Sequence, residues 1–345
     1  MSNKLRTVLA GCGAISHHWM NMTACKELVE IVGLVDLDTD RARAFAAQYQ
    51  LQDAVIGASL GEVLAATGPE AVFDCTVPAA HVQVVCEALQ HGCHVLGEKP
   101  LADTMAHAQE MVQAAQQAGK IYAVIQNRRY DPNIRRLRAF LDSGAIGKIT
   151  TVQCNFLLAA DFGDNFRTVM AHPLVLDMAI HTFDAARLIT SARPQSVYCQ
   201  EWNPAGSWYR GDAAAAAIFE MSEGIVYTYL GSWVARGLNT PWECEWRVIG
   251  DQGSVCWDGV DGYRAETLGD DGQCHPVAVP EIDAGAKTGG HDGVIREFVT
   301  CVRQGGTPET TATDNIYSLA MVLGAIASSE QGAKVTFTQE GLLVP

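Results

Sequence analysis

Six consecutive residues near the start of the chain have the types and spacing of a turn that binds a dinucleotide: Gly11-Cys12-Gly13-Ala14-Ile15-Ser16. The turn follows an apolar run and precedes a helical pattern, which is the context that such a turn requires. Gly11 permits a tight turn, and Gly13 lets the backbone approach a pyrophosphate at the N-terminus of the helix. Ser16 replaces the third glycine of the usual pattern, and its small side chain still allows close packing of helix and strand.

An acidic residue, Asp36, lies 25 residues after Gly11, at the end of a second apolar run. This separation is close to the roughly 20 residues expected for the carboxylate that binds the adenosine ribose. Such a carboxylate accepts hydrogen bonds from the ribose hydroxyls and repels a 2′-phosphate, so the sequence predicts NAD as the preferred cofactor. Arg41 is close enough to weaken this preference, which leaves NADP as an alternative. Asp36 could instead cap a helix that begins at Thr39.

A lysine, Lys99, follows directly after another predicted strand, within Glu98-Lys99-Pro100. In open parallel sheets the ligand crevice lies outside the carboxyl ends of the strands. A partly desolvated lysine there has a lowered pKa that suits proton transfer. The alternative interpretation is a surface lysine in a loop.

Asp177 and His181 are four residues apart in a helical pattern, and Asp184 follows three residues later. Helical spacing predicts that the three side chains share one face. An aspartate beside a histidine keeps it protonated or orients it as a donor. The alternative is a buried pair that ties the helix in place. We expect no metal, because no further ligand spacing accompanies this pair.

The first 126 residues alternate short apolar runs with helical patterns, which predicts a parallel sheet covered by helices on both faces. We therefore interpret residues 1–126 as a dinucleotide-binding Rossmann domain. The predicted strands are 5–10, 30–35, 54–56, 71–75, 93–96 and 121–125, and the predicted helices are 15–26, 39–49, 60–66, 79–90 and 104–118.

The pattern changes in residues 127–345, where strand-like runs follow one another without intervening helices and predict a mostly antiparallel sheet. The fold class is therefore α/β, with a Rossmann domain followed by an α+β domain whose last helices can pack back on the first domain. The predicted helices are 131–141, 174–189, 293–302 and 313–328, and the predicted strands are 148–158, 196–202, 213–221, 225–234, 243–249 and 254–257, with an irregular segment at 160–172.

The composition excludes several classes of protein. The chain has 345 residues, 24 basic and 39 acidic side chains, and a net charge of −15. This balance argues against nucleic acid or an anionic membrane as the main partner. We expect no membrane span, since no run of 18 apolar residues occurs. The N-terminus enters a strand almost at once and the eleven cysteines are irregularly spaced, so we expect a cytoplasmic protein with reduced thiols.

Taken in order along the chain, these motifs resemble the glucose–fructose oxidoreductase / inositol dehydrogenase family (Gfo/Idh/MocA). The resemblance extends from about residue 5 to residue 330. It implies a Rossmann domain joined to an open-faced sheet domain, and hydride transfer between a nicotinamide cofactor and a secondary alcohol or ketone of a sugar, cyclitol or sugar derivative. The segments that carry it are 11–16, Asp36, Thr76-Val77-Pro78, Glu98-Lys99-Pro100, 126–132, 177–181 and 246–254.

The resemblance also implies roles for individual residues. Lys99, Asp177 and His181 would act on the substrate, with His181 or Lys99 accepting the hydroxyl proton. We favour His181 as the base, Lys99 as its electrostatic partner or relay, and Asp177 as the group that holds substrate hydroxyls or orients the pair. The implied cofactor-binding residues are Gly11, Cys12, Gly13, Ala14, Ile15, Ser16, Asp36, Leu37, Arg41, Thr76, Val77, Pro78, His81, Glu98, Lys99 and Gln126, and the implied substrate-binding residues are Lys99, Arg128, Asp161, Arg167, His172, Asp177 and His181.

Two positions depart from the family pattern. Ala79 and Ala80 stand where an asparagine is usual, and Ala171 and His172 stand where many relatives have glycines. The expected partners are a small sugar or polyol and further copies of this chain, as a homodimer or homotetramer formed through the tryptophan-rich sheet. Two alternatives remain open: an enzyme acting on a non-sugar carbonyl, imine or dihydrodiol, and a non-catalytic dinucleotide sensor.

Overall fold

A computed structural model describes residues 4–285 and 287–338. The chain divides into two compact units, and the division falls after Tyr130, after Gly285 and after Ile316. The first unit comprises the described residues 4–130 and 287–316, and the second comprises 131–285 and 317–338. The sequence placed a single boundary after residue 126, whereas residues 127–130 and 287–316 belong with the first unit. The sequence allowed for a return of the last helices to the first domain, but it did not set these boundaries, because they depend on long-range packing.

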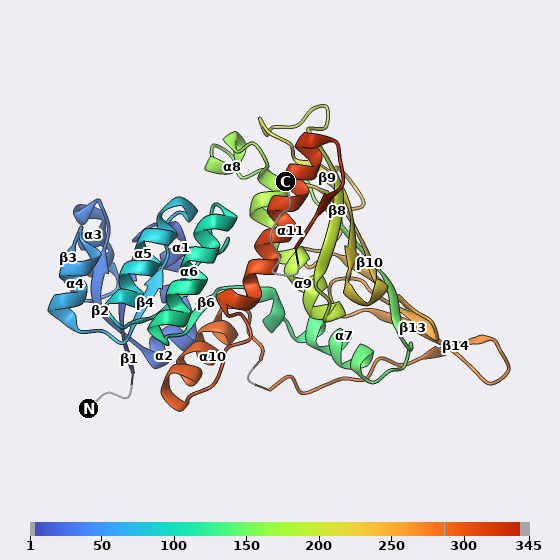
Figure 1. Cartoon of the computed structure of the whole chain (residues 1–345), viewed down its shortest axis with the longest axis horizontal. Coiled ribbons are helices and arrows are strands. Elements are labelled where there is room, and N and C mark those ends of the chain that lie inside the picture. The colour runs from blue at the N-terminus through green and yellow to red at the C-terminus, as the bar shows by residue number, and fades with distance from the viewer. Residues whose placement is uncertain (1–3, 286, 339–345) are drawn as a thin grey trace. The chain divides into compact units, whose positions relative to one another are not determined.

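The first unit contains a six-stranded parallel sheet with the order β3-β2-β1-β4-β5-β6 (Figure 1). The expected parallel sheet is therefore confirmed. Its strands are short and almost wholly apolar, as buried parallel strands require. Their bounds are β1 (Leu5–Ala10), β2 (Val29–Val35), β3 (Val55–Gly57), β4 (Ala71–Asp74), β5 (His94–Gly97) and β6 (Tyr122–Val124).

Helices of the first unit bury apolar faces against this sheet. Side chains of α1, α2, α3 and α10 share one core with β1, β2 and β4, which includes Trp19, Phe45, Phe73 and Phe298. Helices α4, α5 and α6 pack side by side. The bounds are α1 (Ala14–Asn21), α2 (Thr23–Leu28), α3 (Thr39–Gln48), α4 (Leu60–Thr67), α5 (Pro78–Gln90), α6 (Met105–Ala118), the 3₁₀ turn η1 (Asn127–Tyr130) and α10 (His291–Gln304).

The single helix predicted over 15–26 is wrong, because Met22 interrupts it with an extended backbone (φ −65°, ψ 140°). The second helix, α2, begins after Met22, and the backbone N–H of Ala24 donates to the carboxylate of Asp292. This acceptor lies on α10, far along the chain. Local periodicity cannot reveal a cap that tertiary structure supplies.

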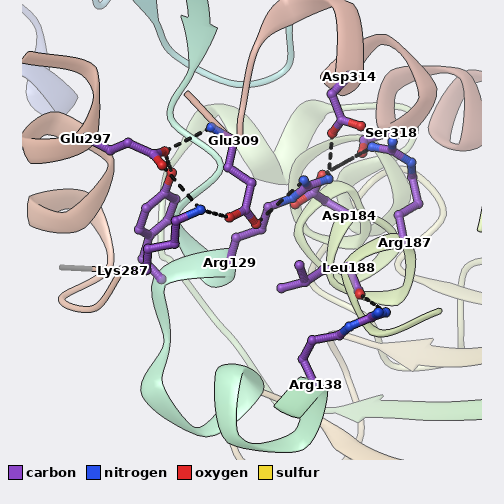
Figure 2. Close-up of polar contacts among 11 residues, drawn as sticks. Arg129, Arg138, Asp184, Arg187, Leu188, Lys287, Glu297, Glu309, Asp314 and Ser318 are labelled. Carbon is purple, nitrogen blue, oxygen red and sulfur yellow. Dashed lines mark hydrogen bonds and ion pairs between the residues drawn. The ribbon is translucent and has the colours of Figure 1, made fainter. Parts of the chain in front are cut away.

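A network of ion pairs holds η1 against the returning segment (Figure 2). Arg129 lies 2.8 Å from Asp314 and 4.0 Å from Glu309. Glu309 also pairs with Lys287 at 2.6 Å, and Lys287 lies 3.4 Å from Glu297. All five side chains belong to the first unit, so the network fixes the chain just after β6.

The second unit contains a nine-stranded sheet with the order β14-β13-β12-β11-β7-β10-β9-β8-β15. Its pairs are antiparallel except for β7 and β10, so the predicted mostly antiparallel sheet is confirmed. The bounds are β7 (Ile149–Leu157), β8 (Pro194–Trp202), β9 (Ala214–Met221), β10 (Val226–Ser232), β11 (Glu245–Gly250), β12 (Gly253–Trp257), β13 (Tyr263–Leu268), β14 (Cys274–Val277) and β15 (Val335–Thr336).

Three of these strands, β13, β14 and β15, were not predicted. Every residue of β14 is exposed and one is a proline, so this strand lacks the apolar alternation that marks a half-buried strand. Such a composition is typical of a strand at the edge of a sheet, where β14 lies. β15 has only two residues, too few for any periodicity.

Helix α9 (Ile180–Thr190) is almost entirely buried in the second unit. Asp184 and Arg187 of α9 both contact Ser318 on α11 (Ala312–Gln331), at 2.7 Å and 2.9 Å (Figure 2). The other helices of this unit are α7 (Pro132–Asp142), α8 (Phe166–Val169), the π-helical η2 (Pro173–Ala179) and the short η3 (Ser222–Gly224). No helix within the described residues is long and apolar enough to span a membrane.

The helix predicted over 174–189 begins differently from the prediction, because residues 173–179 form the π-helical η2 before α9 starts. A π-helical turn contains more residues than an α-helical turn and is frequent at functional sites. The periodicity of the sequence does not distinguish the two.

Candidate active site

Residues at the carboxyl ends of four neighbouring strands meet at one edge of the first sheet. Gly11 follows β1, Asp36 follows β2, Thr76 follows β4 and Glu98 follows β5. Gly11 has a φ of +85°, and a Cβ there would lie 2.7 Å from the carbonyl oxygen of Cys75. Only glycine fits at this crossing, as the sequence pattern indicated.

A cavity of about 670 Å³ opens at this edge, and its lining includes Gly11, Gly13, Asp36 and Thr76. Gly13 is the N-cap of α1 and carries no side-chain cap, while a Cβ placed on it would meet nothing within 4 Å. The backbone at this helix N-terminus is therefore open toward an anion. Ser16 donates to the carbonyl of Gly13 at 2.6 Å and so holds the turn from within. These features fit the pyrophosphate of a dinucleotide.

The carboxylate of Asp36 is fixed at the rim of the cavity. Oδ2 accepts a hydrogen bond from Cys12 N at 2.9 Å, and Oδ1 accepts one from Asp38 N at 2.9 Å. Arg41 lies 3.7 Å away. The cap of α3 is Asp38, which accepts from the backbone of Asp40 and Arg41, so the alternative role of Asp36 as that cap is wrong.

The loop after β4 is anchored from behind by a buried pair. Asp74 Oδ1 accepts from both N and Oγ1 of Thr76, at 3.0 Å and 2.6 Å, and Oδ2 lies 2.7 Å from Nδ1 of His81. Burial lowers the pKa of His81, but the charge and hydrogen bond of Asp74 outweigh this and raise it above its ordinary value. Thr76 and Val77 line the cavity. His81 is fully buried and supports their loop.

Glu98 and Lys99 follow β5. Glu98 is buried, and its carboxylate accepts from Trp19 Nε1 at 2.7 Å and from Lys99 N at 3.1 Å. Burial raises the pKa of Glu98. Lys99 is half-buried and precedes a cis peptide bond to Pro100. The structure thus places Glu98 as a support for the backbone of Lys99.

A histidine pair that the sequence did not single out lies near Lys99. The rings of His18 on α1 and His291 on α10 are 4.4 Å apart. Burial, followed by the charges of His18 and Lys99, lowers the pKa of His291 to about 4. Gln126, after β6, and Arg128, in η1, are both buried in this unit.

The second unit carries Asp177 in η2 and His181 in the first turn of α9, both half-buried. Asp184, expected on the same face, is fully buried and accepts a hydrogen bond from Ser318 at 2.7 Å. His181 and Asp184 lie three residues apart within α9, so they keep the expected helical spacing. Asp177 precedes them in the π-helical η2, which changes its angular spacing from His181, so the shared face of all three stays a prediction.

Arg167 lies over two aromatic rings and contacts Asp177. Its Nε donates to Asp177 Oδ2 at 2.6 Å. The guanidinium carbon lies 4.9 Å from the ring centre of Phe162 and 4.6 Å from that of Phe166. These residues come from the segment predicted to be irregular, which contains the short helix α8. This pairing of Arg167 with Asp177 could not be inferred from sequence spacing.

An aromatic wall supports the same segment. Phe162 packs against Trp233 with 5.2 Å between ring centres, and Trp233 packs against Tyr209. The indole of Trp208 and the hydroxyl of Tyr209 both donate to the carbonyl of Ala160. The segment that presents Arg167 is thereby held against the sheet domain.

Two other predicted substrate-binding residues are engaged within their own unit. Asp161 is exposed and accepts from Gly163 N at 2.8 Å. His172 Nδ1 lies 2.9 Å from Glu201, and its Nε2 lies 3.6 Å from Glu330. The hydrogen bond to Glu201 is the main cause that raises the pKa of His172, while burial raises the pKa of Glu201. His172 thus ties the start of η2 to β8 and α11.

The predicted site residues therefore form two groups. Those expected to bind the cofactor belong to the first unit, as do Lys99 and Arg128, and Asp161, Arg167, His172, Asp177 and His181 belong to the second. Within residues 4–285 and 287–338, no group of three or more His, Cys, Asp or Glu side chains is arranged to hold a metal ion.

Comparisons with known proteins agree with this arrangement. Residues 5–126 match the family described as "Oxidoreductase family, NAD-binding Rossmann fold", and residues 134–256 match the "GFO/IDH/MocA C-terminal domain". The chain is 26% identical to a D-apiose dehydrogenase from Paraburkholderia graminis over 347 residues, which cover 96% of this chain and 89% of the relative. It is 33% identical to an inositol 2-dehydrogenase from Burkholderia cenocepacia over 199 residues, 56% of this chain and 58% of the relative.

A solved structure shares the fold across nearly the whole chain. It is an oxidoreductase from Agrobacterium radiobacter in complex with NAD+, L-tartaric acid and magnesium, with a TM-score of 0.81 and 22% identity, covering 96% of this chain and 98% of that chain. The parallel sheet with its glycine turn falls in the first matched region, and strands β7 to β11 of the large mixed sheet fall in the second. This protein is a member of the Gfo/Idh/MocA family of oxidoreductases, and its first unit is an NAD-binding Rossmann domain.

Proposed function

We propose that this enzyme is an NAD-dependent dehydrogenase or reductase that acts on a secondary alcohol or ketone of a sugar, a cyclitol or a related compound. The observation that carries the proposal is the carboxylate of Asp36, held by two backbone N–H groups at the rim of a dinucleotide-sized cavity. Relatives named D-apiose dehydrogenase and inositol 2-dehydrogenase support the substrate class.

Cofactor binding follows from the first unit. The N-terminus of α1 holds the pyrophosphate beside Gly11 and Gly13, and Asp36 accepts the ribose hydroxyls. Bound NAD supplies the acceptor for the hydride that leaves the carbinol carbon. A 2′-phosphate would bring negative charge against Asp36, so we propose that NAD is preferred over NADP. The remaining residues proposed for this cofactor site are Cys12, Ala14, Ile15, Ser16, Leu37, Arg41, Thr76, Val77, Pro78, His81, Glu98, Lys99 and Gln126, of which His81 and Glu98 act by supporting the backbone around it.

Oxidation of a carbinol also requires removal of its hydroxyl proton. In the proposed mechanism His181 accepts that proton and Lys99 stabilises the developing alkoxide or relays the proton onward. The reverse assignment uses the same two side chains. Asp177, oriented by Arg167 at 2.6 Å, holds a substrate hydroxyl or orients His181. Arg128, Asp161 and His172 complete the proposed substrate contacts.

The assembly is proposed to be a homodimer or homotetramer formed through the exposed face of the second sheet. Tyr198 on β8, Ile218 on β9 and Leu230 on β10 are exposed apolar side chains on neighbouring strands. An apolar face of this kind is typical of an interface. Trp233, Trp246 and Trp257 are buried, whereas Trp202 is exposed on the same side of β8 as Tyr198, so the proposed interface includes only part of the tryptophan-rich region. A monomer in light scattering would contradict the proposal.

We further propose a cytoplasmic enzyme of carbohydrate metabolism. Its eleven cysteines are free, and seven of them are buried, including Cys25, Cys75 and Cys154. Burial raises the pKa of several of these thiols, which keeps them in the unreactive protonated form. Reduced thiols in this number are typical of a reducing compartment.

The test is a panel of sugars, cyclitols and polyols with NAD, followed by NADH absorbance. Turnover of sugars or cyclitols with NAD supports the proposal. Turnover restricted to non-sugar carbonyls, imines or dihydrodiols would show that the enzyme acts on one of those classes instead. A Lys99→Ala variant that binds NADH normally and turns over at the wild-type rate would identify a different mechanism, and binding of NADH without any turnover would point to a sensor.

A further inference from the structure

The guanidinium of Arg167 is held rigidly, yet the protein uses only one of its three nitrogens. Nε donates to Asp177 Oδ2 at 2.6 Å. In the part of the chain that the structure describes, neither Nη1 nor Nη2 has a hydrogen-bond or ion-pair partner. The side chain is 25% exposed, so these two donors are reachable from solvent.

We infer that Nη1 and Nη2 of Arg167 bind a carboxylate of the substrate, so that this enzyme acts on a sugar acid rather than on a neutral sugar. This inference rests on the function proposed above and names its substrate class. Arg167 would then determine specificity, while Asp177, on the other edge of the same guanidinium, contacts the reacting part of the substrate.

The two phenylalanines make Arg167 a pre-organised anion receptor. The guanidinium carbon lies over the rings of Phe162 and Phe166, 4.9 Å and 4.6 Å from their centres, and such contacts use no N–H of the group. The two ring contacts and the bond from Nε to Asp177 therefore hold the group in place and leave Nη1 and Nη2 for a ligand. A planar fork of two N–H donors matches the two oxygens of a carboxylate. Little conformational entropy is lost when such a fork binds.

The position of Asp177 limits where the carboxylate of the substrate can lie. An anion on the Nη edge is separated from the Asp177 carboxylate by the width of one guanidinium. A hydroxyl held by Asp177 and a carboxylate held by Arg167 can therefore belong to one short hydroxy-acid unit. Aldonates have this unit at their first two carbons, and uronates have it at the opposite end of the sugar.

The surrounding charges favour a carboxylate over a phosphate. Asp161 and Asp164 lie on the same segment and are exposed, so they oppose a dianion. Arg167 already shares its charge with Asp177. Arg236 contacts the ring of Trp208 and adds one further cation on a neighbouring segment. This balance accommodates a single negative charge more readily than two.

The experiment compares acids with their neutral counterparts of the same configuration. The substrates are D-gluconate against D-glucitol, D-galactonate against galactitol, and D-glucuronate against D-glucose, with D-glucitol 6-phosphate as the phosphate probe. We measure kcat/KM with NAD and, by calorimetry, the affinity of each compound for the enzyme–NADH complex. The proteins are the wild type, Arg167→Gln, Arg167→Lys and Arg210→Gln. Arg210 is an exposed arginine that matches the charge change.

We expect the wild type to prefer an acid over its neutral counterpart by about 10- to 100-fold, the ratio that charge-assisted hydrogen bonds support. Arg167→Gln should abolish the ratio and Arg167→Lys should keep part of it, because an ammonium retains the charge without the fork. Arg210→Gln should leave it unchanged. Loss of the Arg167–Asp177 contact should lower kcat/KM for acids and neutral compounds by the same factor. The ratio of their kcat/KM values therefore reports only the contact between Arg167 and the carboxylate of the substrate. Thermal melting checks that each variant is folded.

Distinct outcomes separate this inference from the proposed function. Equal turnover of acids and neutral compounds, or an acid preference that survives in Arg167→Gln, would overturn the inference and leave the dehydrogenase proposal intact. A preference for the phosphate would overturn it as well. If no compound is oxidised, the dehydrogenase proposal is in doubt, and the inference is decided by calorimetry. Acid binding lost in Arg167→Gln supports it, and absence of acid binding refutes it.

Discussion

Nδ1 of His81 lies 2.7 Å from Oδ2 of Asp74, and neither side chain is exposed to solvent. The same carboxylate holds Thr76 through its other oxygen. One buried pair therefore joins the end of β4, the loop that lines the cofactor cavity and the first turn of α5. We expect damage to this pair to affect both stability and cofactor affinity.

Replacing His81 with Phe should lower the free energy of unfolding by about 3–5 kcal/mol, because it leaves a buried carboxylate without its partner. The pKa of His81 is raised, so its contribution is complete below the unfolded value of about 6.5 and is lost as pH rises through the folded pKa. The difference in unfolding free energy between the wild type and the variant should therefore decrease as the pH rises from 5.5 into the alkaline range. Urea unfolding across this range measures it.

The matched control is His107→Phe, which removes a partly exposed histidine that lies 2.6 Å from Asp103. Surface pairs contribute about 0–1 kcal/mol, so this variant should unfold almost as the wild type does. If the difference in unfolding free energy between the wild type and His81→Phe grew with rising pH, the charged form of His81 would not be the stabilising one, and the prediction would be wrong.

The cofactor preference should depend on Asp36. Asp36→Ala removes the acceptor proposed for the ribose hydroxyls and the charge that opposes a 2′-phosphate, while Arg41 remains 3.7 Å from the vacated position. We expect KM for NAD to rise by about 10- to 100-fold and KM for NADP to fall. Steady-state kinetics with both cofactors measures the change. Asp40→Ala removes an exposed carboxylate from the same helix start and should leave the ratio of the two constants unaltered.

Lys99→Met keeps an apolar side chain of similar length and removes the ammonium. We expect kcat to fall by about 10²- to 10⁴-fold, the usual contribution of a proton-transferring group. The Kd for NADH should change far less than kcat, because Glu98 would still accept from the backbone N–H of residue 99 and keep the loop in place. Fluorescence titration gives Kd, and Lys26→Met, at an exposed lysine, serves as the control. A variant with normal kcat would remove Lys99 from the mechanism.

The hydrogen bond between His172 and Glu201 should be visible in the titration of the histidine. Glu201→Gln removes the main cause that raises the pKa of His172, so that pKa should fall toward its ordinary value. Histidine resonances followed by NMR from pH 5 to 9 measure the shift. Glu330→Gln should have the smaller effect, since Glu330 is 3.6 Å away and largely exposed. If the pKa of His172 fell equally in Glu201→Gln and Glu330→Gln, the hydrogen bond to Glu201 would not be its main cause.

Much of this fold was predictable because local physical signals decide it. Strands β1, β2, β4, β5 and β6 are short apolar runs, and their interior position makes them visible in the sequence. Asp131 and Pro132 marked the start of α7 correctly, and Asp131 accepts from Asn133 N at 2.7 Å as an N-cap should. Where a side chain far along the chain sets a boundary, as Asp292 does for α2, the prediction was wrong.

In the candidate site, too, some residues could be predicted from local patterns and others depend on tertiary structure. The positions of Gly11 and Asp36 at neighbouring strand ends beside one cavity were predictable, because the residues that follow parallel strands meet at one edge of the sheet. The contact of Arg167 with Asp177 depends on how an irregular segment folds over aromatic rings, and no spacing rule describes that. The role of Asp38 as the cap of α3 was also missed, because Asp36 and Asp38 are both suitable caps by composition.

The core of the first unit is completed by residues from late in the chain. The ring centre of Phe298 lies 6.2 Å from that of Phe73, and Asp292 accepts a hydrogen bond from the first turn of α2. A ribosome synthesises the glycine turn and all six strands long before it reaches α10. During that interval the nascent chain exposes the apolar surface that Val294, Ile295 and Phe298 later cover. The cofactor-binding unit can therefore mature only after α10 has been translated, and a gene truncated after codon 130 should yield an aggregating product.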